Sequence, residues 1–144
     1  MANIKQKYIK PGRDYNYSEG VKVKAGEAIA SGDMVAATSY DGPFMVVSKA
    51  DKDATTTRRG RLFIAKHAIA SGSFGVVLPW RLVTGVDTSA GSAGDWVYLG
   101  DAGAPHTFGS APGSSEDRKV GTIITDHAST GAWLFTGEGP GEPN

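Results

Sequence analysis

The chain has 144 residues, of which 40% are hydrophobic and 20 are glycine, and its formal net charge is zero. This length and apolar content predict one folded domain with a real core and exclude wholesale disorder. Zero net charge argues against a whole-protein field that would draw the chain to nucleic acid or to an anionic membrane. The absence of cysteine excludes disulfides, thiolate metal sites and a cysteine nucleophile. No run approaches the ~20 apolar residues of a membrane span, and the first residues lack the apolar region of a secretory signal, so we expect a soluble protein.

The first expected element is an extended N-terminal arm over residues 1–20, in which Pro11-Gly12 breaks any helix. Its basic and tyrosine side chains are candidates for contact with a partner: Lys5, Lys7, Tyr8, Lys10, Arg13, Tyr15 and Tyr17. Tyrosine is enriched at interfaces, whereas disordered tails are poor in aromatic residues. Residues 1–24 carry a net charge of +4 and the remaining 120 residues −4. We therefore expect an arm that reaches for an acidic neighbour, such as another copy of the body, with a frayed terminus as the alternative.

Short runs of β-branched and aromatic residues, separated by Gly, Asp, Ser and Thr, predict nine or ten strands over residues 21–136. Asp41-Gly42 lies between two of these runs and is typical of a hairpin turn. The best helix candidate, residues 48–60, lacks an apolar stripe, so we expect a single turn or a loop there. The predicted fold is all-β: a small single-domain β-barrel or tulip-like β-sandwich, with a flexible C-terminal tail over residues 137–144.

A turn-then-strand phrase recurs within this region. The sequence AIASG occupies residues 28–32 and 68–72, each time ahead of an apolar run, and residues 90–100 repeat the rhythm loosely. Glycine allows a positive φ at a tight turn, aspartate bonds backbone N–H groups there, and the next valine begins an inward-facing strand. Because the spacings differ, we interpret the phrase as a recurring barrel corner rather than as a solenoid. The candidate turn residues are Gly26, Gly32, Asp33, Gly42, Gly72, Gly94 and Asp95.

Arg58, Arg59 and Arg61 cluster at the entry to a predicted strand. Such charges either discourage pairing at a sheet edge or form a patch that faces an acidic partner. Nucleic-acid binding is disfavoured, because no aromatic stacking platform accompanies the patch. The three tryptophans lie in predicted strands and are expected to pack in the core, with Trp80 as the exception. It follows Pro79, which favours a sheet edge, so Trp80 is a candidate interface anchor.

The sequence contains no catalytic or cofactor-binding constellation that we recognise. Its three histidines are not accompanied by a GxSxG elbow, and it has neither a phosphate loop nor an HExxH motif. Residues 51–57 begin like a calcium loop, but Thr56 replaces the required glycine and Leu62 the final glutamate. We therefore expect no enzymatic activity, no cofactor and no bound metal.

Residues 58–100 join an Arg-Gly before a strand to the turn AIASGSFGVV and the segment DTSAGSAGDWVYL, and residues 120–124 read VGTII. With AGEAIASGDMVAA fitting the same pattern, residues 21–136 resemble the capsid cement, or decoration, proteins of tailed bacteriophages. The resemblance implies a small β-rich protein that is not an enzyme. Such proteins bind the outside of the assembled, expanded capsid, commonly as trimers at three-fold or quasi-three-fold positions, and tie neighbouring capsomers together.

The resemblance implies two partners, the major capsid protein and further copies of this chain in a homotrimer, and neither nucleic acid nor membrane. The implied location is the outer capsid surface of the virion, after synthesis in the host cytoplasm. Two other functions stay open. One is a phage head-fibre or tail module that binds host surface glycans. The other is a biotinyl- or lipoyl-like carrier domain, which the turn phrase also resembles, although no Met-Lys-Met element is present and Lys49 and Lys66 lie in unsuitable contexts.

Overall fold

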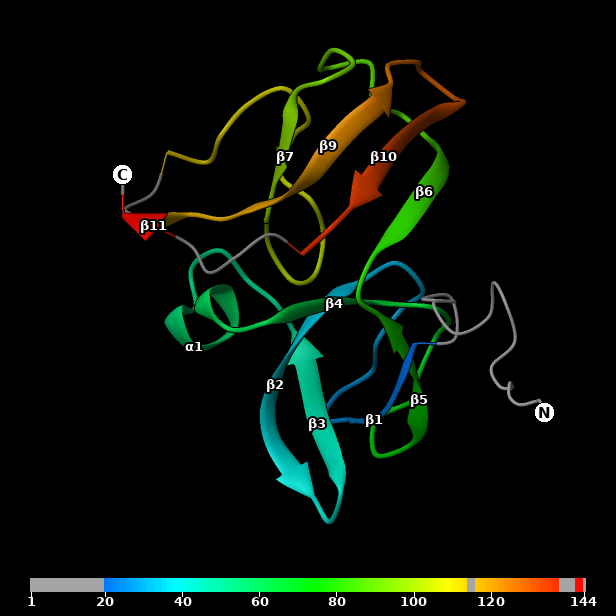
Figure 1. The fold of residues 1–144 in the computed structure, drawn as a ribbon, viewed down its shortest axis with the longest axis vertical. Helices are drawn as coiled ribbons and strands as arrows, with labels where there is room; N and C mark the ends of the chain where they lie inside the picture. The colour runs from blue at the N-terminus through cyan, green and yellow to red at the C-terminus, as the bar shows by residue number, and fades with distance from the viewer. Residues whose placement is uncertain (1–19, 114–115, 138–141, 144) are drawn as a thin grey trace, which may run out of the picture.

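The computed structural model describes residues 20–113, 116–137 and 142–143. It is 47% strand and 4% helix, which confirms the predicted all-β class. The elements in chain order (Figure 1) are β1 (Val21–Ala25), β2 (Met34–Asp41), β3 (Phe44–Lys49), α1 (Thr55–Arg59), β4 (Leu62–Ala65), β5 (Phe74–Leu78), β6 (Arg81–Val86), β7 (Trp96–Tyr98), β8 (Glu116–Asp117), β9 (Lys119–Thr125), β10 (Gly131–Phe135) and β11 (Glu142–Pro143).

The first five strands close into a barrel in the order β1-β3-β2-β4-β5. Neighbouring strands pair antiparallel, except that β1 and β3 run parallel. The predicted hairpin is confirmed: β2 returns as β3 through Gly42 and Pro43, with Gly42 at φ +60°. The far half of this hairpin projects from the barrel (Figure 1), and residues 37–41 are exposed.

A second, antiparallel sheet lies against one side of the barrel in the order β6-β10-β9-β7 (Figure 1). The chain passes into it directly, because only Pro79 and Trp80 separate β5 from β6. A third, two-stranded sheet pairs β11 with β8. Within the predicted C-terminal tail, the backbone of Glu142 pairs with Asp117 and that of Pro143 with Glu116.

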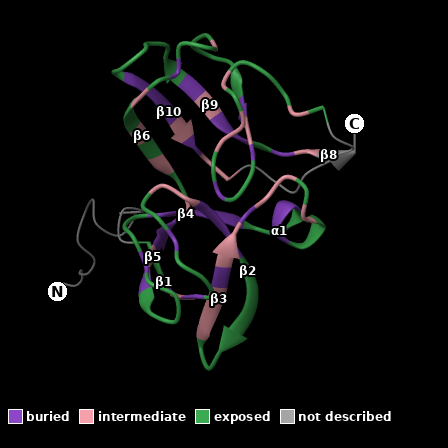
Figure 2. Ribbon diagram, turned by 180° about the vertical axis from the view of Figure 1, so that it is seen from behind, coloured by how far each residue is buried: buried purple, intermediate pink, exposed green. Residues whose placement is uncertain are grey.

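Two hydrophobic cores hold these layers together. The barrel core contains Val23, Ala25, Ile29, Val35, Val47, Phe63, Ala65, Ile69 and Val77. The inter-sheet core contains Met34, Ala36, Ala50, Leu62, Ile64, Leu78, Val97, Leu99, Val120, Ile123, Trp133 and Phe135. Figure 2 shows the buried residues gathered where β4, β9 and β10 face one another across the layers.

Strand β4 contributes to both cores, which explains its unbroken apolar sequence. Successive side chains of a strand point to opposite faces. Leu62 and Ile64 therefore enter the inter-sheet core, while Phe63 and Ala65 enter the barrel core, and all four are buried. A strand covered on both faces needs apolar residues at every position instead of every second one.

The first two copies of the turn phrase form equivalent corners. The Gly32 N–H donates to the Ala65 carbonyl (2.9 Å), and the Ala65 N–H donates back to the Asp33 carbonyl (2.8 Å). In the second copy, the Gly72 N–H donates to the Ala25 carbonyl (2.8 Å), and the Ala25 N–H donates back to the Ser73 carbonyl (2.9 Å). Both glycines have a positive φ, +88° and +81°, which side-chain-bearing residues rarely adopt.

The third copy repeats this geometry in the second sheet. The Gly94 N–H donates to the Ile123 carbonyl (2.7 Å), and the Ile123 N–H donates to the Asp95 carbonyl (2.9 Å). The Asp95 carboxylate accepts the Ser92 N–H (2.9 Å), as the Asp33 carboxylate accepts the Ala30 N–H (2.8 Å) in the first copy. The predicted corner, with glycine for the turn and aspartate for the backbone donors, is confirmed at these positions.

The spacing of the first two copies reflects an internal symmetry of the barrel. Ile29 and Ile69, at the centre of each copy, exchange two backbone hydrogen bonds of 2.9 Å and are both 3% exposed. The same spacing of 40 residues relates two strand pairs. Adding 40 to the residue numbers of β2 and subtracting 40 from those of β4 turns the register between β2 and β4 into the register between β5 and β1. The repeat is therefore an internal pseudo-two-fold of the barrel, in which the two copies meet at its axis.

Two of the local predictions are corrected. Gly26 does not have a positive φ; a Cβ there would lie 3.1–3.3 Å from Val46, Val47 and Ser48, so close packing of the backbone explains this glycine. Trp96 was expected in the core but is 43% exposed, because it lies on the face of β7 that points away from the barrel, whereas Trp133 is buried as expected.

The helix candidate becomes α1, a helix of five residues, close to the single turn that the sequence predicts. Within the part of the chain that the structure describes, no helix is long and apolar enough to cross a membrane.

Candidate interaction surfaces

The arm side chains proposed as partner contacts lie outside the described residues. They are Lys5, Lys7, Tyr8, Lys10, Arg13, Tyr15 and Tyr17. The described chain begins at Gly20, which is exposed, and Val21 begins β1.

Arg58 does not belong to the exposed arginine patch that the sequence predicts. Its side chain is only 7% exposed; Nη1 donates to the Lys52 carbonyl (2.7 Å) and Nη2 to the Thr55 hydroxyl (3.3 Å). Arg118, which the sequence did not single out, is 2% exposed and donates from Nη1 to the carbonyls of Arg58 (2.6 Å) and Gly60 (2.8 Å). Arg58 thus ties α1 to the loop before it, and Arg118 joins the end of α1 to the residue that precedes β9, so both side chains make contacts within the fold.

Arg59, Arg61 and Trp80 stay accessible. Arg61 lies over the Phe63 ring at 5.1 Å and donates from Nε to the Leu62 carbonyl (3.3 Å). Trp80 is 44% exposed in the connection between β5 and β6. These three side chains remain candidates for contact.

The largest feature that the sequence analysis missed is a row of side chains across the outer face of the second sheet. We call it the apolar sheet face, and its residues are Leu82, Leu134, Thr122, Trp96 and Ile124. Cross-strand partners share a face, and the register runs from Leu82 through Leu134 and Thr122 to Trp96. Ile124 lies two positions from Thr122 on β9 and is 49% exposed.

This surface combines apolar area with a nearby positive charge. Leu82 is 48% exposed, and the Lys119 ammonium lies 4.8 Å from the centre of the Trp96 ring. Exposed apolar residues grouped on one sheet face are a feature of interaction sites, whereas single exposed apolar residues need no explanation. The signal in the sequence is that β6 and β9 carry apolar residues at both odd and even positions, although only one face of this sheet meets the barrel.

A smaller aromatic cluster lies on the outside of the barrel. The Phe44 and Phe74 rings are 5.0 Å apart in an edge-on arrangement, and the Lys22 ammonium lies within 5.4 Å of both. Beside them, Lys24 pairs with Asp41 at 2.8 Å, with both side chains partly in solvent. Exposed pairs of this kind contribute little to stability, so the cluster is a second, smaller candidate surface.

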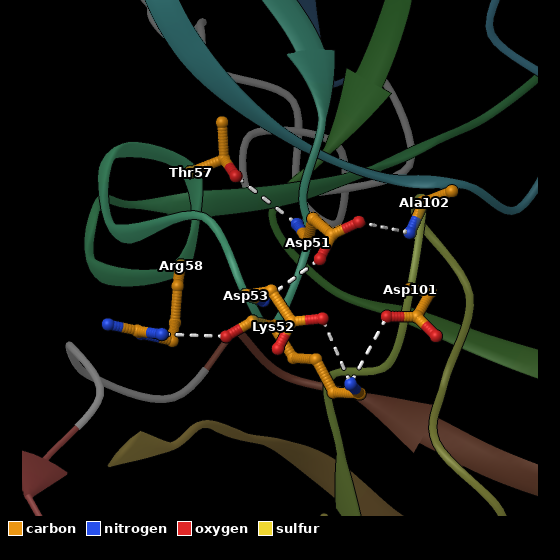
Figure 3. A network of polar contacts seen from close by, with 7 residues as sticks. All are labelled: Asp51, Lys52, Asp53, Thr57, Arg58, Asp101 and Ala102. Carbon is orange, nitrogen blue, oxygen red and sulfur yellow. Dashed lines mark hydrogen bonds and ion pairs between the residues drawn. The ribbon is translucent and has the colours of Figure 1, made fainter. Parts of the chain in front are cut away.

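The incomplete calcium-like sequence contributes to an acidic cluster (Figure 3). Asp51, Asp53 and Asp101 each offer a carboxylate oxygen within 4.8 Å of the others. The Lys52 ammonium lies 3.1 Å from Asp53 and 3.3 Å from Asp101, and these hydrogen bonds, Asp53 first, raise the pKa of Lys52. Asp51 accepts the N–H groups of Asp53 (2.9 Å) and Ala102 (3.1 Å). The cluster thus links two loops through its own lysine and backbone donors.

His127 lies close to Ser129, but its geometry is that of a turn. Its Nδ1 accepts the backbone N–H groups of Ser129 (3.0 Å) and Thr130 (3.1 Å), and these contacts close the turn. The Asp87 carboxylate accepts the hydroxyl and N–H of Ser89 (2.6 and 3.0 Å), and these bonds lower the pKa of Asp87. This end of the sheet is therefore built from turn-stabilising contacts.

Comparison with models of protein families, with curated proteins and with solved structures finds no match to this chain.

Proposed function

We propose that this protein is a capsid cement protein that binds the outside of the assembled head of a tailed bacteriophage. In this proposal it joins neighbouring copies of the major capsid protein as a homotrimer at three-fold and quasi-three-fold positions, and it acts without catalysis. The resemblance of residues 58–100 and 120–124 to decoration proteins supports the choice of partner.

The structural observation that carries the proposal is the apolar sheet face. Its exposed residues, Leu82, Trp96 and Ile124, lie on strands fixed by the inter-sheet core beneath them. A rigid surface of this kind loses little conformational entropy on binding, which favours contact with a large, ordered partner such as a shell.

Stabilisation of a shell follows from linkage. A ligand that binds the assembled shell and not its separated subunits shifts the equilibrium toward assembly by mass action. A trimer that contacts several capsomers at once gains avidity of about 10²–10⁴ over one contact. The arm tyrosines Tyr8, Tyr15 and Tyr17 would add further anchors, since tyrosine is enriched among binding hot spots.

The test is co-sedimentation with empty heads of the phage that encodes the chain, prepared in the expanded and the unexpanded form. We expect saturable binding to expanded heads. The double variant Leu82→Ser/Trp96→Ser should reduce occupancy by about tenfold or more. Tyr40→Ser is the matched control, because Tyr40 is 80% exposed but lies on β2 of the barrel, and it should bind as the unmodified chain does.

Absence of binding to both kinds of head would contradict the proposal. Binding to host surface glycans on an array, with none to heads, would favour the head-fibre or tail-module alternative. The trimer is tested separately by light scattering, where we expect three times the chain mass of 15.0 kDa. A single-chain mass in solution together with monomeric density on decorated heads would refute it.

A further inference from the structure

The two edges of the second sheet differ in whether another part of the described chain covers them. At one edge, β7 has only three residues, and the following loop closes over it: the His106 N–H donates to the Tyr98 carbonyl (2.8 Å), and Leu99 forms a bridge with Pro105. At the other edge, β6 has six residues and pairs with β10 on one side, and no strand among the described residues pairs with its other side. A long, uncovered edge presents N–H and C=O groups that another strand can pair with.

The chain enters the fold beside this edge. Val21 pairs with Val77 of β5, and a Cβ on Gly20 would lie 2.7 Å from Val76 and 2.9 Å from Leu78. β1 runs antiparallel to β5, and only Pro79 and Trp80 separate β5 from β6. A segment before Gly20 that kept the direction of β1 would therefore meet β6 antiparallel.

The sequence of the arm matches the length of this edge. Residues 13–19 lie between the Pro11-Gly12 break and Gly20, and they contain no further proline or glycine. They can span about 23 Å when extended, and β6 requires about 20 Å. Tyr15 and Tyr17, with a period of two, are residues that favour strands.

The charges of the residues before Pro11-Gly12 are complementary to those at one end of the second sheet. The end of the sheet at which β6 stops carries three exposed carboxylates, those of Asp87, Asp95 and Asp126. The segments around them, residues 84–96 and 124–132, contain no lysine or arginine. The residues before Pro11 carry Lys5, Lys7 and Lys10 and no acidic residue.

We propose that residues 13–19 pair antiparallel with the free edge of β6 in the same copy of the chain, as a fifth strand of the second sheet. The chain then turns at Pro11-Gly12, and the lysines before it lie against the acidic end of the sheet. This docking covers the exposed strand edge and extends the apolar sheet face by one strand. It does not depend on the proposed function, and its test uses no capsid.

The test is hydrogen exchange, measured by mass spectrometry on the full chain. We expect the β6 amides that point away from β10 to exchange about tenfold or more slowly in the full chain than in a variant lacking residues 1–19. Tyr15→Pro removes a backbone donor and disfavours strand pairing. It should therefore speed the exchange of these β6 amides as the deletion does, but within the intact chain. Asn3→Pro, before the break, is the matched control and should leave β6 exchange unchanged.

Peptides from β9, an interior strand, should exchange alike in all variants, which shows that the body stays folded. Raised salt should lower the protection of β6, because it screens the lysine contacts. Equal β6 exchange in the full chain and in Tyr15→Pro overturns the proposal. Protection that appears only at high protein concentration also overturns it, since the strand would then come from a second copy.

Discussion

Removing the buried guanidinium of Arg118 should unfold the protein far more readily than removing an exposed charge. Arg118→Met keeps most of the side-chain volume but deletes two charge-assisted hydrogen bonds, to the carbonyls of Arg58 (2.6 Å) and Gly60 (2.8 Å). Hydrogen bonds to charged groups contribute ~1.5–3 kcal/mol each, and the Arg58 carbonyl loses its donor in a buried setting and the Gly60 carbonyl in a partly buried one. Allowing for the apolar packing of methionine, we expect a loss of about 3–5 kcal/mol in the free energy of unfolding.

The assay is urea unfolding followed by circular dichroism, with thermal unfolding alongside. A loss of this size corresponds to a fall in Tm of roughly 10–15 °C for a domain of this length. Lys66→Met removes the same charge from an exposed position and should change the free energy by less than about 0.5 kcal/mol. Arg118→Lys should fall between the two, because an ammonium lacks the planar fork that reaches both carbonyls. A change below ~1 kcal/mol for Arg118→Met would refute the view that this side chain joins α1 to the second sheet.

The remaining predictions concern the core, the sheet face and one carboxylate. Ile64→Ala should cost about 2–5 kcal/mol in urea unfolding, since it opens a cavity in the inter-sheet core; a cost under ~1 kcal/mol would show that the layers do not pack as one unit. Leu82→Ser/Trp96→Ser should leave the free energy of unfolding within about 1 kcal/mol of the unmodified chain, because both side chains are exposed, and a larger loss would assign them to the fold instead. NMR titration should find the pKa of Asp87 below its ordinary value, and Ser89→Ala should return it upward. Because that folded-state pKa is lowered, any stability from the contact is present at neutral pH and is lost as the pH falls through it; an unchanged titration in Ser89→Ala would contradict the assignment.

Local chemistry was sufficient for much of this fold. The hairpin at Asp41-Gly42 and the corners at Gly32, Gly72 and Gly94 follow from backbone conformations that glycine adopts without strain, so a few consecutive residues specify them. The all-β class follows equally from short apolar runs between turn residues. These features depend on neighbours in the sequence, and the sequence displays those neighbours directly.

Which face of each strand is covered was decided only by the tertiary structure. Trp96 and Trp133 both lie in strands, but one points to solvent and the other into the inter-sheet core. Arg58 is buried beside an exposed Arg59, because its guanidinium turns back toward the loop before α1 and donates to the Lys52 carbonyl. The row that runs from Leu82 to Trp96 joins four strands through cross-strand pairs between segments far apart in the sequence.

A residue in a strand points to one of two faces, and the sequence fixes only that its neighbours point the other way. Whether that face meets a barrel, a second sheet or water depends on pairings between distant segments, such as Ile29 with Ile69, which form when whole layers pack. The sequence therefore determined the strands and their corners, and the packing of the two sheets determined which side chains are left at the surface for a partner.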